Sequence, residues 1–189
     1  VLNLSSAMLL YSVINALYNY IRFGNILSNG VTYHLKNPHF DSLYNKYGFF
    51  SPVFLPINIY YNFLNPLRLK INFPFIEPDP EGNGIFFISP LFLYIFKMNI
   101  KKLFDNKKRA IFYLSMFISI ILILMPILFL FGTGWFQFGA RYLLDIMPFL
   151  IILLIKPLNN FKSKWSWILL ILSIFFNIMG YFWWNSLNL

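Results

Sequence analysis

Two long apolar runs constrain what this chain can fold into. Residues 110–131 contain no charged side chain, and residues 165–184 form a second uncharged run framed by tryptophan and tyrosine. An α-helix needs about twenty apolar residues to cross bilayer hydrocarbon, and aromatic rings gather at the two interfaces. Only 11% of the residues are charged, compared with about one quarter in an average soluble domain. The sequence therefore predicts an all-α integral membrane protein.

Three further segments are apolar enough to be interpreted as spans, near residues 1–20, 85–100 and 140–155. The second is short and contains Pro90, but it carries the chain from a long polar loop to a strongly basic segment, which favours a crossing. We therefore expect about five transmembrane helices in a single membrane domain. Because the chain enters an apolar segment at Val1 with no basic leader, we expect the C-terminal part of a longer protein.

The positive charges indicate which side each loop faces. Short loops between the predicted spans carry nine of the fifteen basic residues, namely Lys97, Lys101, Lys102, Lys107, Lys108, Arg109, Lys156, Lys162 and Lys164. Such short basic loops are typical of the cytoplasmic face. The loop 21–83 is then extracytoplasmic. Because the net charge of +9 is explained by this bias, we expect no nucleic acid partner.

The long loop contains one predicted helix between Pro56 and Pro66. Its apolar residues recur at helical spacing, and asparagines occupy the other side; the apolar set is Ile57, Tyr60, Tyr61 and Leu64. This pattern favours a short interfacial helix lying on the membrane surface. A packed helix of a soluble subdomain is the alternative.

Two groups of charged residues are candidate functional sites. Arg141 and Asp145 stand four residues apart at the mouth of the predicted span 140–155, where a charge is expensive to desolvate and is a functional candidate. Arg141 could instead reach the lipid headgroups, with Asp145 as its structural partner. Glu77, Asp79 and Glu81 alternate with prolines and could bind a divalent cation or supply an acid or base. A solvated turn is the alternative interpretation.

Four segments together resemble a known family. They read NYIRFGNILSNG, INIYYNFLNP, FPFIEPDPEGNGIFFISPLFL and GWFQFGARYLLDIMPFLIILL, and they cover the chain from about Tyr18 to about Pro157. In order and placement they resemble the C-terminal half of bacterial multi-spanning GT-C type glycosyltransferases, such as protein mannosyltransferases and lipid A aminoarabinose transferases.

The resemblance implies an enzyme of the bacterial plasma (inner) membrane. It implies transfer of a sugar from a polyprenyl-phosphate donor to a glycan, lipid or protein acceptor on the extracytoplasmic side. The catalytic acid of such enzymes lies in the first extracytoplasmic loop, upstream of this segment, so no catalytic residue is assigned here. The remaining partner is the surrounding membrane lipid.

The donor phosphate is an anion, and the arginine fork matches phosphate bidentately. Arg141 is the first candidate for this contact, followed by Arg22 and then by Arg68 or Lys70. Asp145 would orient Arg141, while Tyr142 and Trp135 could stack near the sugar or serve only as interfacial aromatics.

Two other functions remain open. A transporter or flippase of lipid-linked saccharides would also place arginine near a phosphate path, although polar residues in mid-span and internal repeats are not evident. A non-catalytic membrane assembly subunit would have no requirement for Arg141.

Overall fold

The computed structural model describes residues 2–28, 38–134, 136–158 and 162–187. It is mostly helical, which confirms the all-α prediction apart from one small hairpin. The chain divides into two compact units, 1–45 and 46–189, and each is described by itself. Within the described residues, two helices are long and apolar enough to cross a membrane, so the larger number of predicted spans is not confirmed.

These two helices are α6 (Lys107–Phe129) and α8 (Lys164–Leu187). The Asn106 side chain caps α6 by accepting a hydrogen bond from the Lys108 backbone nitrogen, a favoured arrangement at a helix start. In each helix only 17% of the most apolar window is buried. A core helix of a soluble protein would bury most of that surface, so the exposed apolar side chains favour contact with lipid.

Two other predicted spans do not fold as single regular α-helices. The first consists of α4 (Ile85–Ile88), a break at Ser89 and the 3₁₀ helix η4 (Pro90–Lys97). The second consists of the 3₁₀ helix η5 (Arg141–Ile146), which continues into α7 (Met147–Leu158). Pro90 has no N–H and disfavours helical geometry in the residue before it, which explains the first interruption.

Helix α8 satisfies the backbone groups that this interruption leaves free. The Asn177 side-chain amide donates to the Ile88 carbonyl at 3.0 Å and to the Ser89 hydroxyl at 3.2 Å, while the Leu91 N–H donates to the Ser173 hydroxyl at 3.0 Å. Such side-chain partners allow a broken helix to persist in an apolar environment.

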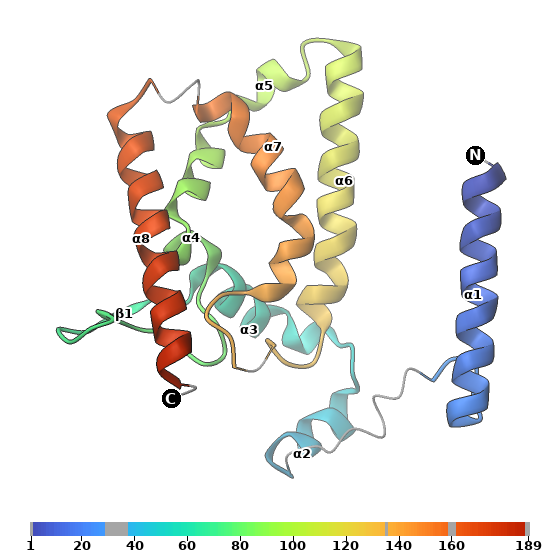
Figure 1. The fold of residues 1–189 in the computed structure, drawn as a ribbon. Coiled ribbons are helices and arrows are strands. Elements are labelled where there is room, and N and C mark those ends of the chain that lie inside the picture. The colour runs from blue at the N-terminus through green and yellow to red at the C-terminus, as the bar shows by residue number, and fades with distance from the viewer. Residues whose placement is uncertain (1, 29–37, 135, 159–161, 188–189) are drawn as a thin grey trace. The chain divides into compact units, whose positions relative to one another are not determined.

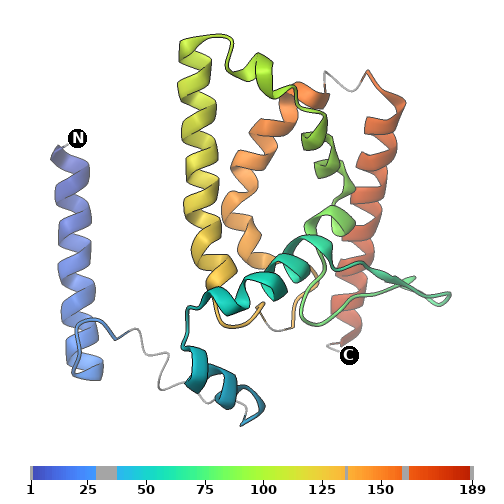
Figure 2. The ribbon, with the colours of Figure 1, turned by 180° about the vertical axis from the view of Figure 1, so that it is seen from behind.

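The larger unit is a row of helices in the order α6, α7, α4–η4 and α8 (Figures 1 and 2). Two buried clusters hold the row together. One joins η4, η5 and α7 around Tyr94, Leu143 and Ile146. The other lies beside the short helix α5 (Ile100–Leu103) and includes Leu103, Tyr113 and Leu153.

The predicted loop helix forms from a 3₁₀ turn, η2 (Pro52–Phe54), from α3 (Leu55–Ile59) and from a π-helical turn, η3 (Tyr60–Leu64). Its asparagine side faces the protein. Asn58 is 1% exposed and donates to the Leu128 and Leu130 carbonyls at 2.9 and 2.8 Å. Ile57 and Leu64 of the apolar side remain exposed. The helix therefore packs against the protein through its asparagines, while its apolar side stays exposed; the choice between an interfacial helix and a packed helix of a soluble subdomain stays a prediction.

A two-stranded antiparallel hairpin, β1 (Arg68–Leu69) and β2 (Ile76–Glu77), follows this helix. The prolines of this segment have no N–H and disfavour a helix, which is consistent with its extended geometry. The Phe73 and Phe182 rings lie 5.2 Å apart between centroids, which places the hairpin against α8.

The amino-terminal unit contains α1 (Leu2–Phe23) and most of α2 (Pro38–Tyr47). Helix α1 covers the span predicted near 1–20, but it is not among the helices apolar enough to cross a membrane. Its serines and asparagines lower its hydropathy. It ends at Gly24, whose φ of 69° and N–H bond to the Tyr20 carbonyl are typical of a glycine helix terminus.

Candidate functional site

Two motifs that are far apart in the sequence meet beyond the C-terminal end of α6. The backbone N–H of Gln137 donates to the Pro80 carbonyl at 3.0 Å, and that of Asn83 donates to the Phe138 carbonyl at 3.2 Å. Asn83 and Gly139 also form a parallel bridge. The acidic loop and the segment leading to Arg141 therefore form one surface at this end of the helices (Figure 1).

Three side chains, Glu81, Thr133 and Gln137, hold this junction together, and we call them the clasp. The Gln137 amide donates to the carbonyls of Glu81 and Thr133, both at 2.9 Å, and its oxygen accepts from the Arg141 N–H at 3.3 Å. The Thr133 hydroxyl donates to the Glu81 carboxylate. Gln137 is only 6% exposed, so its amide satisfies backbone groups that water reaches poorly.

Glycines make room for the Gln137 side chain. A Cβ on Gly82 would lie 2.7 Å from Nε2 of Gln137, and one on Gly134 would lie 2.8 Å from its Oε1. Both glycines also have positive φ, at 101° and 121°, values that other residues rarely adopt. The clasp therefore requires glycine at both positions.

Asparagines shape the acidic loop from inside. Asn83 is fully buried; its amide donates to the Pro66 carbonyl at 2.8 Å and its oxygen accepts from the Asp79 N–H at 3.0 Å. Asn65 donates to the Gly82 carbonyl at 2.8 Å. Sequence reasoning did not select Gln137, Asn83 or Asn65. The sequence signal that could have found them is the position of amide residues beside glycine or proline in an irregular segment.

The three loop carboxylates have structural contacts of their own. The Asp79 carboxylate accepts from the Glu81 N–H at 3.0 Å, Glu81 accepts from Thr133, and Glu77 stands opposite Arg68 in the hairpin register. Among the residues that the structure describes, no three Asp, Glu or His side chains gather in a way that could hold a metal ion. The predicted cation site therefore has no support in this geometry.

The predicted pairing of Arg141 with Asp145 does not form. No ion pair joins these two described residues; the Arg141 guanidinium instead lies 5.4 Å from the centroid of the Tyr142 ring. The pairing assumed an α-helix, whereas η5 is a 3₁₀ helix with three residues per turn, which rotates residues four apart onto different faces. Arg141 and Asp145 are both exposed, so Arg141 is open to an anion.

The other predicted phosphate contacts belong to both units of the chain. Arg68 and Lys70 are exposed on the hairpin. Arg22 belongs to the amino-terminal unit, where its Nη1 donates to the Tyr18 hydroxyl at 2.6 Å. Trp135 lies outside the described residues. The ring stack found near the clasp joins Phe136 and Trp183, at 6.4 Å between centroids, and neither ring was selected from the sequence.

Tyr61 lies near the acidic loop. Burial raises the pKa of its hydroxyl above the usual value, and the negative charges of Asp79 and Glu81 raise that pKa further. The neutral phenol is therefore the form that this surface favours at physiological pH.

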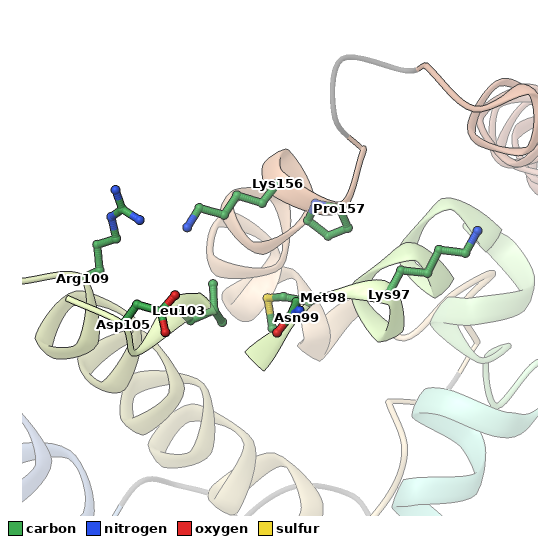
Figure 3. Close-up of a pocket in the computed structure, with 8 residues that line it drawn as sticks. All are labelled: Lys97, Met98, Asn99, Leu103, Asp105, Arg109, Lys156 and Pro157. Carbon is green, nitrogen blue, oxygen red and sulfur yellow. The ribbon is translucent and has the colours of Figure 1, made fainter. Parts of the chain in front are cut away.

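A separate cavity of about 480 Å³ lies at the other end of α6, between the start of that helix and the end of α7. Its lining includes the cations Lys97, Arg109 and Lys156, together with Met98, Leu103 and Asp105, and we call it the basic pocket. Figure 3 shows the Arg109 and Lys156 side chains extending toward the same space from two different helices. No sequence motif had joined these two residues.

No family model matches this chain, and neither the curated proteins nor the solved structures gave a significant match. The functional proposal therefore depends on the residues and their geometry.

Proposed function

We propose that this chain is the donor-binding part of a membrane glycosyltransferase that moves a sugar from a polyprenyl-phosphate donor to an acceptor. The observation that carries the proposal is the clasp. It joins the acidic loop to the segment that presents Arg141, at one end of two helices with lipid-compatible surfaces. The two motifs with the most distinctive resemblance to the family therefore form a single surface.

The chemistry of this surface suits a lipid phosphate. Arg141 is exposed and has no carboxylate partner within the described residues, so its five donors remain available for phosphate oxygens. In the proposed arrangement, Arg141 lies beside the span α7. It could therefore contact the phosphate of a lipid whose hydrocarbon tail lies in the bilayer. Asp145, freed from Arg141, could accept from sugar hydroxyl groups. No residue of this segment is assigned the role of catalytic acid.

The dimensions of the interrupted helices support a five-span arrangement as part of this proposal. A 3₁₀ helix rises about 2.0 Å per residue and an α-helix about 1.5 Å. Residues 141–158 then reach about 30 Å, close to the hydrocarbon thickness, and residues 85–97 reach about 25 Å. With α1 included, five segments could cross the membrane, which would place the clasp and loop 21–83 on the extracytoplasmic side.

A binding experiment tests the role of Arg141. The protein in detergent is titrated with a short-chain polyprenyl phosphate, and quenching of tryptophan fluorescence reports binding. Loss of the guanidinium in Arg141→Ala should weaken binding about tenfold or more, because a charge-assisted contact is lost. Lys108→Ala removes one exposed charge at the other end of α6 and should bind like the unchanged protein.

Sugar transfer by the intact enzyme completes this test. Arg141→Ala should sharply reduce transfer from a polyprenyl-phosphate sugar while the amount of protein in the membrane stays the same. Unchanged turnover would remove Arg141 from the donor site. Normal lipid-phosphate binding with no transfer by the full-length protein, accompanied by movement of the lipid-linked sugar across vesicle membranes, would favour the transporter.

A further inference from the structure

The basic pocket carries a positive charge that the protein itself does not neutralise. Arg109 and Lys156 line it with one acid, Asp105, while the Lys97 ammonium extends away from them and lies 4.4 Å from the centroid of the Tyr94 ring (Figure 3). Two positive charges and one negative therefore leave a net charge of +1. Within the described residues, no ion pair involves Arg109 or Lys156. Lys156 lies 4.9 Å from the centroid of the Tyr113 ring, which positions its ammonium group without cancelling its charge.

The start of α6 increases this positive potential. Arg109 lies in its first turn, which contains no acidic residue. A helix N-terminus carries a partial positive charge, which adds to the charge of the Arg109 guanidinium. An anion bound between the helices would relieve the repulsion between the two.

The floor and the surroundings of the pocket are apolar. Leu103, on the floor, is 1% exposed and belongs to the buried cluster that includes Tyr113 and Leu153. Phe112 of α6, three residues after Arg109, is exposed by 49%, and Ile152 of α7, four residues before Lys156, is exposed by 39%, so each shares a helix face with a pocket cation. A cationic cavity bordered by exposed apolar helix surfaces matches a ligand that has an anionic group and hydrocarbon chains.

We propose that the basic pocket binds the headgroup of an anionic phospholipid from the leaflet at this end of α6. The Arg109 guanidinium and the Lys156 ammonium hold the phosphodiester oxygens, and the acyl chains lie along Phe112 and Ile152. The Asp105 carboxylate accepts from headgroup hydroxyls, which favours a glycerol headgroup. Basic pockets between membrane helices are suited to such lipids. This site is separate from Arg141 and does not depend on the proposed function.

Lipid binding can be measured on the whole chain. The protein is purified in neutral detergent and titrated with phosphatidylglycerol or phosphatidylcholine, with retained lipid detected by native mass spectrometry and the unfolding temperature recorded in parallel. We expect phosphatidylglycerol to be retained and to raise the unfolding temperature more than phosphatidylcholine does. The double variant Arg109→Gln/Lys156→Gln should weaken retention of phosphatidylglycerol about tenfold or more.

The matched control is Lys107→Gln/Lys108→Gln, which removes two exposed charges from the same helical turn outside the pocket. It should keep the preference for phosphatidylglycerol. Equal losses in both double variants would overturn the site in favour of general surface attraction. Equal stabilisation by inorganic phosphate, sensitive to the same pocket variant, would overturn the lipid assignment. Should the double variant lose its circular dichroism signal, Lys156→Gln alone replaces it, and unchanged lipid retention by that variant would contradict the proposal.

Discussion

Side-chain amides bind the irregular backbone of this protein together. Gln137, Asn58 and Asn83 are each at least nine-tenths buried, and each donates to main-chain carbonyls that no helix or strand satisfies. An amide is suited to this because it donates and accepts without a charge that must be desolvated. In a structure with few charges and interrupted helices, these contacts determine where the loops lie.

Gln137→Ala tests this role. The change removes two donated bonds and one accepted bond of a buried side chain, so we expect a loss of about 1–3 kcal/mol in stability. Thermal unfolding in detergent provides the measurement. Thr133→Val, which removes only the hydroxyl bond to Glu81, should have a smaller effect; an equal or larger effect would contradict the central position assigned to Gln137.

Tyr61 predicts a dependence on alkaline pH. Because burial and then Asp79 and Glu81 raise its folded-state pKa, the phenol ionises first in the unfolded chain. The stability that Tyr61 contributes is complete below its unfolded-state pKa of about 10, and it is lost as the pH rises through its higher folded-state pKa. Between pH about 8 and about 11, Tyr61→Phe should therefore lose less stability than the unchanged protein. If both proteins lost the same stability over this pH range, Tyr61 would not be the group responsible.

At the scale of elements, the main departure from simple helical geometry is the use of 3₁₀ helices. Both η4 and η5 occur where an apolar run adjoins an irregular segment, and both alter which side chains share a face. Hydrophobic composition predicts that such a run is helical, but it does not distinguish three residues per turn from 3.6. That distinction decided whether Arg141 could meet Asp145.

Asn177→Leu tests the contact that supports the break at Ser89. The variant should leave α8 helical, because leucine is a good helix former, but it removes the amide bonds to Ile88 and Ser89. We expect a lower unfolding temperature and faster proteolysis near residues 85–97. Asn185→Leu, a change of the same chemistry at an exposed position of α8, is the control. Equal behaviour of the two variants would argue against this contact as a support.

At the scale of the whole molecule, the sequence predicts the helical layers better than the site. Residues 110–131 and 165–184 predict α6 and α8 because length and apolarity are local properties. Pro56 and Pro66 likewise predict the approximate limits of the loop helix. The clasp was not predictable in this way, because Gln137 meets Glu81 although the two residues are 56 positions apart in the chain. The basic pocket was not predictable either, because it forms only when α6 and α7 pack together.

The proposed arrangement in the membrane predicts a labelling pattern. The chain has no cysteine, so a single introduced thiol reports one position. Glu77→Cys, exposed on the hairpin, should react with an impermeant maleimide added to intact cells, while Lys108→Cys, exposed at the start of α6, should react only after lysis. The reverse pattern would invert the orientation. Labelling of both in intact cells would rule out an odd number of crossings between them.

Residues 85–97 depend on α8 for hydrogen bonds at the break at Ser89, and this dependence affects when they can fold during synthesis. Ile88 and Leu91 leave the ribosome more than eighty residues before their partners Asn177 and Ser173. Until α8 emerges, the free carbonyl and N–H at the break need water or another protein group. In the proposed five-span arrangement, we therefore expect residues 85–97 to enter the bilayer late, together with the last helix, rather than in the order in which they are translated.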